Sequence, residues 1–427
     1  MLNRKPYRRA RAFLAALALC TLIAPPARAA ELGADLEGLL AYARTQSPEL
    51  AAMQHEAEAA AQRVQPAGAL PDPVLRVELE NINNYGNDAP PSLRPSKVGD
   101  TKYTLMQSFP LWGKRDLRRD VATADANRAG AVTKATWNEL SAKLKAGYAQ
   151  YYQAVSSERI TLEVIDLLSR LERLAQARYA GGLVAQQDVI RAQLEMSAAR
   201  GELITLDNDK RQARVRLNAL LGRDVAAPLA EPQALRRLPP VSELDAPMLL
   251  QRARTVNPSL AAEEARLRGA QSNRDLVQKN RYPDILVGVV PTQMGSKITT
   301  WGLMFEMNIP LQQDSRRAQE SEAEAMLSAQ RDRVQAAANQ LLGVLGENLA
   351  ALDAARRWDS LASTRLVPQA ELSLQSALAT YENGRIDFAT LLDAQRQIRK
   401  AKLDHLKSQV EAQIRLAEIE RIVGEDL

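Results

Sequence analysis

The phrase YENGRIDFATLLDAQ, residues 381–395, interrupts a region that otherwise has the composition of one continuous helix. Its Asn383-Gly384 pair is a helix-ending signal, because glycine readily adopts the positive φ angle found just beyond helices. A related phrase, YAGGLVAQQDVIRAQ, occupies residues 179–193. The Tyr, Gly and Gln residues that the two phrases share recur at an offset of 202 residues, so the chain contains the same break twice.

The repetition extends over nearly the whole chain after residue 29. LLAYARTQSPEL at 39–50 is similar to LLQRARTVNPSL at 249–260, and NALLGRD at 218–224 is similar to ERIVGED at 420–426. We therefore predict an internally duplicated chain: a first structural repeat at 30–222, a linker at 223–247 and a second repeat at 248–427. The linker is rich in proline, which prevents a continuous helix through it.

Each repeat has the same predicted order of elements. Alternation of apolar and polar side chains with a period of two predicts two strands per repeat, at about 72–80, 101–109, 284–290 and 299–309. Heptad-like spacing predicts long antiparallel coiled-coil helices around each glycine break, at 113–180, 186–222, 312–383 and 387–424. The predicted fold class is mainly α with a small β part made of two β-hairpins.

The helix that follows each glycine break is too short to lie alongside the whole length of the long helix that precedes the break. In the first repeat it has 37 residues, at 186–222, against 68 residues at 113–180. We expect the helix that precedes the β-hairpin to stack end to end with the returning helix. The remaining length would be covered by the short first helix or by the proline-rich linker, as a belt around the middle.

Residues 1–29 have the layout of a secretory signal: a basic start, an apolar run at 12–23 and a cleavage site at Ala27-Arg28-Ala29. This segment carries six of the 56 basic residues and no acidic ones, which leaves 50 basic against 51 acidic groups. The net charge thus gives no reason to expect a nucleic-acid partner. Cys20, the only cysteine, lies in the apolar run, and bulky Leu19 before it argues against lipidation.

The predicted strands have the length and the single apolar face needed to cross an outer membrane, where only closed barrels satisfy every backbone group. Four strands cannot close a barrel, so the chain would have to oligomerise. Two copies would give eight strands and a filled interior, whereas three copies would give twelve strands and a lumen. A soluble periplasmic coiled coil carrying a small sheet is the alternative.

The doubled plan and the phrases GLVAQQDV at 182–189 and NGRIDFATLLDAQ at 383–395 resemble the TolC-type outer-membrane efflux factors, in particular the heavy-metal branch with CzcC- and CusC-like proteins. The resemblance covers essentially all of 30–427. It implies a homotrimer with a 12-strand outer-membrane β-barrel and a 12-helix periplasmic tunnel. It also implies docking on a periplasmic adaptor and on an inner-membrane pump, usually of the resistance-nodulation-division class.

The function that the resemblance implies is the exit duct of a tripartite efflux system. Heavy-metal cations are the expected cargo, and drugs or secreted proteins are the alternative. The duct would lie in the outer membrane and extend into the periplasm.

The resemblance further assigns the two glycine breaks, 181–185 and 383–386, to turns at the periplasmic tip. Gly182 and Gly384 would reverse the chain there. The residues that follow these glycines would face the adaptor, with plain packing of the hairpin as the alternative. These residues are Leu183, Val184, Arg385 and Ile386.

Asp393 matches a family aspartate that narrows the closed tip, and three copies would form an acidic ring that attracts cations. The second gate aspartate of the family falls at Thr390 here, which leaves one carboxylate per chain. Asp188 and Asp387 lie at the start of the returning helices. For these two residues we favour a structural role, as caps or as complements of the helix dipole. For Asp393 a structural role remains the alternative to the gate.

Trp112, Trp301 and Phe109 lie at or near strand ends and fit either interfacial aromatic girdles or packing of the barrel wall. The basic cluster at 114–119 begins the long helix and is expected to form a solvated face. It contains Lys114, Arg115, Arg118 and Arg119.

No pattern in the chain indicates catalysis: it lacks a nucleotide-binding glycine loop after a strand and a metalloprotease helix signature. We therefore expect neither an enzyme nor a cofactor. His55 and His405, the only histidines, lie in separate repeats on polar helical stretches. A metal-binding role is not expected for either, and His405 should be exposed.

Overall fold

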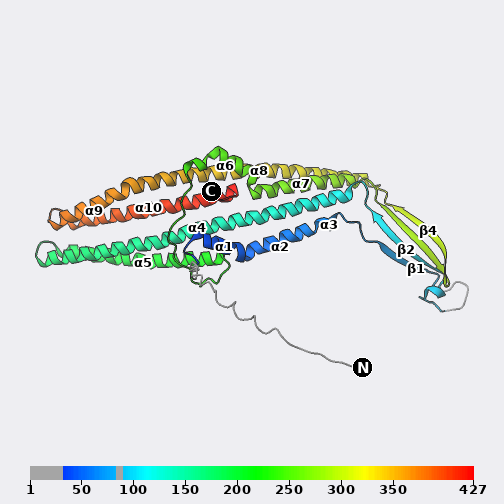
Figure 1. Ribbon diagram of the computed structural model, residues 1–427, viewed down its shortest axis with the longest axis horizontal. Coiled ribbons are helices and arrows are strands. Elements are labelled where there is room, and N and C mark those ends of the chain that lie inside the picture. The colour runs from blue at the N-terminus through cyan, green and yellow to red at the C-terminus, as the bar shows by residue number, and fades with distance from the viewer. Residues whose placement is uncertain (1–31, 83–89) are drawn as a thin grey trace, which may run out of the picture.

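The computed structural model describes residues 32–82 and 90–427. The predicted signal segment, including Cys20, lies outside these residues. The chain forms long rows of helices with one four-stranded antiparallel sheet at one end (Figure 1). The predicted fold class, mainly α with a small β part, is confirmed.

The sequence before the linker contributes five of the α-helices: α1 (Leu36–Gln46), α2 (Pro48–Gln62), α3 (Val64–Ala67), α4 (Lys114–Ala180) and α5 (Gln186–Leu220). The rest of the chain contributes α6 (Ala246–Val256), which begins in the last two residues of the predicted linker, and then α7 (Pro258–Lys279), α8 (Gln313–Leu361), α9 (Val367–Glu382) and α10 (Phe388–Val423). In the described part of the chain, no helix has both the length and the apolar character that a membrane span requires.

A π-helical turn, Ala362–Leu366, separates α8 from α9, where the sequence predicted one helix. The cause lies in Pro368, which follows the turn. Proline has no N–H to donate to the carbonyl four residues earlier, and its ring clashes with that carbonyl, so a regular α-helix is disfavoured there. The N–H of Val367 instead donates to the carbonyl of Ala362, five residues earlier.

The returning helices stack end to end with the helices before the sheet, as predicted. Gly222, just past α5, lies against Pro48 at the start of α2, and a Cβ on Gly222 would come within 2.8 Å of the proline ring. At the equivalent joint, the amide of Asn257 donates to the carbonyl of Ile422 over 2.7 Å. Ser47 and Asn257 also cap α2 and α7, so each joint is built from a capping side chain followed by proline.

The stacked helices form four parallel rows (Figure 1). One central row is α4, and the other consists of α10 and α7. The two central rows contact each other along their length. One outer row, α5 with α2, contacts α4, and the other, α8 with α9, contacts α10 and α7. The structure therefore has two outer edges.

The core is divided among several apolar clusters along the rows. Near the middle, α1 packs Leu39 and Ala43 against α4, and linker residue Leu229 joins the same cluster. On the other side, α6 packs Leu249 and Ala253 against α8 and α10. The expected belt around the middle is thus made from both the short helices and the linker.

The sheet consists of β1 (Val74–Glu80), β2 (Asp100–Phe109), β3 (Ile285–Met294) and β4 (Lys297–Met307) in that order. Each half of the chain supplies one antiparallel pair, and β2 pairs with β3 to join them. In the described residues β1 and β4 each pair on one side only. The strands follow one another across the sheet in the same order as the helical rows to which they connect. α3 leads into β1, β2 leads into α4, α7 leads into β3, and β4 leads into α8.

Candidate functional site

One face of the sheet is apolar and exposed. The strand register places Leu75, Leu105, Val289 and Leu303 in one line across all four strands. All four side chains are exposed, Leu303 to 85%. A continuous apolar surface of this kind on a sheet indicates contact with another apolar phase or partner, because exposing such a surface to water is energetically unfavourable.

The opposite face of the sheet is largely polar. It carries charged side chains from β1, β2 and β4, among them Arg76, Glu78, Lys102 and Glu306. The Nζ of Lys102 lies 2.6 Å from a carboxylate oxygen of Glu80 on the neighbouring strand. The sheet thus separates an apolar side from a polar side, which is the pattern of a barrel wall around an aqueous interior.

The tryptophans near the sheet differ in their surroundings. Trp301 points from the apolar face and is 70% exposed. Trp112 stacks on Tyr282 with ring centroids 5.1 Å apart, and its indole N–H donates to the carbonyl of Pro283 over 3.1 Å. Trp301 therefore suits an interfacial girdle, while Trp112 packs at the junction between sheet and helices. Phe109 ends β2 and is half-buried.

The expectation that the basic cluster at 114–119 is solvated is wrong for Lys114. Its side chain is only 3% exposed, and Nζ donates to the Tyr282 carbonyl and to an Asp284 carboxylate oxygen, both at 2.8 Å. Arg115 donates to the carbonyl of Gly68. A buried ammonium needs such partners to offset its lost hydration. Lys114 thus ties the start of α4 to the segment that enters β3.

Both glycine breaks have the same hydrogen-bonded turn at the end of a long helix. Gly182 and Gly384 each have φ of +71°, the left-handed conformation expected for them. The N–H of Leu183 donates to the carbonyl of Arg178, and that of Arg385 to Thr380, in each case five residues back. This is the Schellman arrangement, which satisfies the last carbonyls of a helix and requires the left-handed residue.

The four residues proposed for docking differ in exposure. Leu183 is 70% exposed and Arg385 is also exposed, so both stand on the outer surface of the turns. Val184 and Ile386 are half-buried, and Ile386 packs against the apolar cluster under the tips. Leu183 and Arg385 are therefore the side chains free to meet another molecule.

The two tips are joined by Arg178, a residue that the sequence did not single out. Its guanidinium donates to the carbonyls of Tyr381 and Glu382 at the end of α9. It also lies over the Tyr381 ring, 4.9 Å from the centroid. Tyr381 is buried against Phe388, and this burial raises the pKa of its hydroxyl. Arg178 of α4 thus satisfies backbone carbonyls at the end of α9, which belongs to the other hairpin.

At the start of α10, Asp387 is the helix cap. Its carboxylate accepts hydrogen bonds from the Thr390 N–H, over 2.9 Å, and from the Thr390 hydroxyl. These bonds lower the pKa of Asp387. The structural role expected for Asp387 is confirmed, and Thr390 is its partner. Asp188 lies in the first turn of α5 without a side-chain cap bond.

Asp393 lies on the exposed surface of α10, about one turn beyond Thr390. Arg396, one turn further on, pairs with Glu195 of α5, and Asp393 adds to the field that raises the pKa of this arginine. The side chain of Asp393 is therefore accessible in the single chain.

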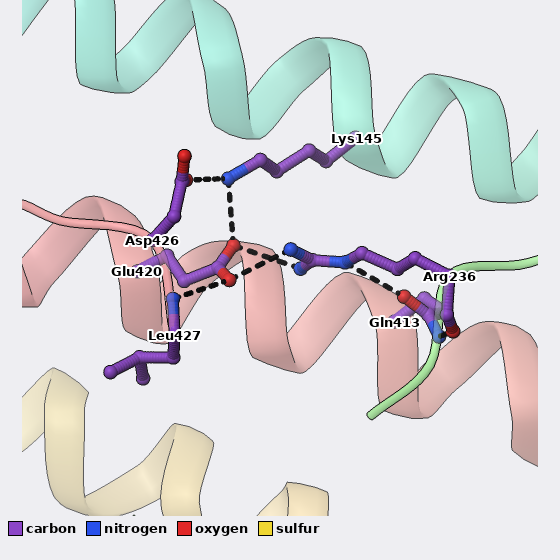
Figure 2. Close-up of polar contacts among 6 residues, drawn as sticks. All are labelled: Lys145, Arg236, Gln413, Glu420, Asp426 and Leu427. Atoms are coloured by element: carbon purple, nitrogen blue, oxygen red, sulfur yellow. Dashed lines mark hydrogen bonds and ion pairs between the residues drawn. The ribbon is translucent and has the colours of Figure 1, made fainter. Parts of the chain in front are cut away.

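Near the middle of the bundle lies a network of ionic groups that was not found from the sequence, and two of its members, Lys145 and Glu420, are buried (Figure 2). Glu420 of α10 accepts a bidentate pair of hydrogen bonds from Arg236 of the linker, at 2.7 and 2.8 Å, and one from Lys145 of α4, at 2.8 Å. Lys145 also contacts Asp426, and Arg236 exchanges hydrogen bonds with Gln413. The network connects both central rows, the linker and the C-terminal residues.

The histidines lie on different helices. His55 is exposed on α2 and pairs with Glu58. His405 is only 26% exposed, and its Nε2 lies 3.0 Å from Asp359 of α8. The expectation that His405 is exposed is therefore wrong, because α8 packs over this part of α10. In the described residues, no group of three or more His, Cys, Asp or Glu side chains is arranged to hold a metal ion.

Several known proteins resemble the chain. The family model "outer membrane efflux protein" matches residues 39–223 and 249–425. The cobalt-zinc-cadmium resistance protein CzcC of Cupriavidus metallidurans is 25% identical over 398 residues, which cover 91% of this chain and 90% of CzcC. The pyoverdine export outer membrane protein OpmQ of Pseudomonas putida is also 25% identical, over 412 residues that cover 90% of this chain and 84% of OpmQ.

The fold is shared with solved channel structures. The outer-membrane channel OprN superposes with a TM-score of 0.79 at 20% identity, covering 91% of this chain and 89% of OprN. CusC superposes with a TM-score of 0.77 at 15% identity, covering 91% and 92%. The family model spans well over half of the chain in its two matches. The chain therefore belongs to the outer membrane efflux protein family and is an outer-membrane channel of an efflux system.

Proposed function

We propose that this chain is the exit duct of a tripartite system that exports heavy-metal cations, together with a periplasmic adaptor and an inner-membrane pump of the resistance-nodulation-division class. The observation that carries the proposal is the four-stranded sheet with one exposed apolar face, whose two edges are unpaired among the described residues and which continues directly into four rows of helices. A wall of this form becomes a closed channel when copies join edge to edge.

The assembly that we propose is a homotrimer. Three copies of the four-stranded sheet give a 12-strand barrel in the outer membrane, with the apolar face toward lipid, and the helical rows give a 12-helix tunnel in the periplasm. In this proposal, each chain is internally duplicated, with repeats at 30–222 and 248–427, a linker at 223–247 and a signal peptide at 1–29. The two separate matches of one family model support the duplication.

The glycine turns form the periplasmic end of the duct in this proposal. Leu183 and Arg385, exposed beyond Gly182 and Gly384, contact the adaptor, with Val184 and Ile386 supporting them from below. Asp393 lines the bore and forms a ring of three carboxylates that attracts cations. Thr390 contributes no charge to this ring because its hydroxyl does not ionise, and this hydroxyl donates to the Asp387 carboxylate.

Heavy-metal cations are the proposed cargo because of the similarity to CzcC, a cobalt-zinc-cadmium resistance protein. The equal identity to a pyoverdine exporter makes an organic chelator the second candidate. In either case the duct would act passively, and selection of the cargo would rest with the pump and the adaptor.

Two measurements test the proposal. The purified protein, extracted with detergent and added to a planar bilayer, should produce ion conductance, and a water-soluble protein without channel activity would rule out the duct. Deletion of the gene should lower the tolerance of the cells to cobalt, zinc or cadmium, with recovery on complementation. Unchanged metal tolerance combined with reduced chelator export would assign the cargo to the second candidate.

A further inference from the structure

A cavity lies beside α4 in the middle of the bundle, next to both end-to-end joints. Its volume is about 450 Å³, which is in the range of pockets that hold small molecules. Arg44 of α1, Leu50 of α2 and both Lys134 and Trp137 of α4 line it. Val256, the last residue of α6, also lines it. The cavity is therefore built from both halves of the chain.

Part of the cavity wall is apolar. Leu50, Trp137, Val256 and Pro258 contribute carbon surface to it. Leu50 is fixed in the core, with 4% of its surface exposed, whereas Val256 is 49% exposed. A ligand with an apolar body would cover this surface and remove it from water, which is favourable.

The charge of the cavity has one sign. Among the described residues that line it, the only charged side chains are Arg44 and Lys134. In the described part of the chain, Lys143 of the same helix α4 pairs with Glu139, whereas neither Arg44 nor Lys134 forms an ion pair. Two cations at one cavity favour a ligand that carries negative charge.

Trp137 holds the guanidinium of Arg44 in place. The central carbon of the guanidinium lies 5.4 Å from the centroid of the indole ring, in a cation–π contact. The ring itself packs against the apolar cluster of α1 and α4. A guanidinium can bind a carboxylate through two parallel hydrogen bonds. Because Arg44 is positioned before a ligand arrives, less conformational entropy is lost on binding.

The carboxylates of a neighbouring cavity have other partners. This smaller cavity, of about 140 Å³, also contacts Trp137 and is lined by Glu420, Glu425 and Asp426. Each of the three carboxylates pairs with a cation other than Arg44 and Lys134. The nearby acidic groups are therefore already compensated by other side chains.

The second repeat retains only part of this set of residues. In the similar phrases LLAYARTQSPEL and LLQRARTVNPSL, Arg254 occupies the place of Arg44. Trp137, however, falls opposite Asn339 at the 202-residue offset of the glycine turns, within the stretch QAAAN at 335–339. Packing of the duplicated helices thus does not require an aromatic ring at this position, which favours a role for Trp137 at the cavity.

We propose that this cavity binds a small organic anion with a planar apolar body, such as an aromatic carboxylate. Its carboxylate accepts hydrogen bonds from Arg44 and Lys134, and its apolar body lies against Leu50 and Val256. Because the wall comes from both repeats, the bound anion holds the two end-to-end joints together. The inference goes beyond the proposed function, since it names a ligand site that conduction of a cargo does not need.

Equilibrium dialysis of the purified full-length protein against naphthoate tests the site, with the same detergent on both sides. Naphthoate should bind at least tenfold more tightly than naphthamide, which has the same ring system without the charge. Arg44→Gln and Lys134→Gln should each weaken naphthoate binding by about tenfold, the effect of losing one hydrogen bond to a charged group.

Matched substitutions control for charge and for shape. Arg254→Gln removes the arginine at the equivalent place of the second repeat, and Lys143→Gln removes a lysine of α4 outside the cavity. Both should leave naphthoate binding unchanged. Val256→Phe fills the cavity without changing its charge and should abolish binding, while helix content by circular dichroism stays the same.

Three results would overturn the inference. The first is equal binding of naphthamide and naphthoate, or equal weakening by Arg44→Gln and Arg254→Gln, because the cavity would then not recognise an anion. The second is no binding of naphthoate, in which case bilayer conductance of the same preparation shows separately whether the duct stands. The third is loss of adaptor binding in Arg44→Gln without naphthoate binding by the unmodified protein, which would assign the two cations to a protein partner.

Discussion

Glu420 is the carboxylate at the centre of the ionic network in the middle of the bundle. Its buried carboxylate faces two cations, Lys145 from α4 and Arg236 from the linker (Figure 2). The side chains of Glu420 and Lys145 are both nearly inaccessible to water. Removing one member of a buried ionic group leaves the others without compensation, which costs more than the intact group contributes.

Glu420→Gln should therefore destabilise the protein by about 3 kcal/mol, in the range for broken buried ion pairs. Urea unfolding followed by circular dichroism measures the change. Glu418→Gln on the same helix is the matched control, because its partly exposed pair with Arg421 should contribute under about 1 kcal/mol. Equal effects of the two substitutions would show that the network around Glu420 is not a centre of stability.

Asp393 is the residue that we expect to restrict passage of ions at the tip. In the proposed trimer it forms an acidic ring, and Thr390 stands where the family has the second gate aspartate. Asp393→Ala should raise basal conductance or weaken block by added divalent cations in planar bilayers. Glu371→Gln, on the exposed surface of α9, is the control and should change neither. If Asp393→Ala also leaves both properties unchanged, Asp393 has no part in the gate.

At the scale of elements, the glycine turn after α9 depends on backbone conformation. Gly384 has φ of +71°, and a side chain there would also approach the guanidinium of Arg178. Gly384→Val should cost about 1–2 kcal/mol, the cost of a left-handed L-residue, and should reduce export in cells. Gly346→Val is the control, since Gly346 is helical and has open space around it. Equal export by both variants would argue against the turn.

The start of α10 depends on Asp387 in its ionised form. The folded chain lowers the pKa of this carboxyl, so its contribution to stability is present above the unfolded pKa and is lost as the pH falls through the folded value. Asp387→Ala should speed hydrogen exchange at the Thr390 N–H at neutral pH. Asp387→Asn should preserve protection, because asparagine is also a good cap. Unchanged exchange in the alanine variant would contradict the cap.

The elements that could be predicted from the sequence are those determined by residues close together in the chain. The glycine turns follow from Gly182 and Gly384, and the end-to-end joints follow from capping residues before Pro48 and Pro258. The positions of Lys114 and Arg178 had no such signal, because their partners lie 168 to 204 residues away in the chain. The π turn had a local signal in Pro368, which helical periodicity alone does not reveal.

At the scale of the whole molecule, the candidate site could be predicted only in part. The tip and gate positions came from resemblance to a family, since Leu183 or Asp393 alone carries no distinctive chemistry. The network around Glu420 depends on how α4, the linker and α10 meet, and no spacing in the sequence encodes that meeting. Long-range packing therefore determines most of what holds the proposed duct together.

The two faces of the sheet give the last prediction, which concerns insertion of the assembled protein into the membrane. Leu303 points from the apolar face and Thr300 from the opposite face of the same strand. A lysine on the lipid side of a barrel costs about 2–4 kcal/mol near the middle of the membrane, whereas one on the lumen side stays in water. Leu303→Lys should therefore reduce the amount of trimer in outer-membrane fractions, and Thr300→Lys should leave it near the unmodified level. Loss of trimer in the Thr300 variant alone would reverse the assignment of the faces, and equal tolerance of both would mean that the sheet does not contact lipid.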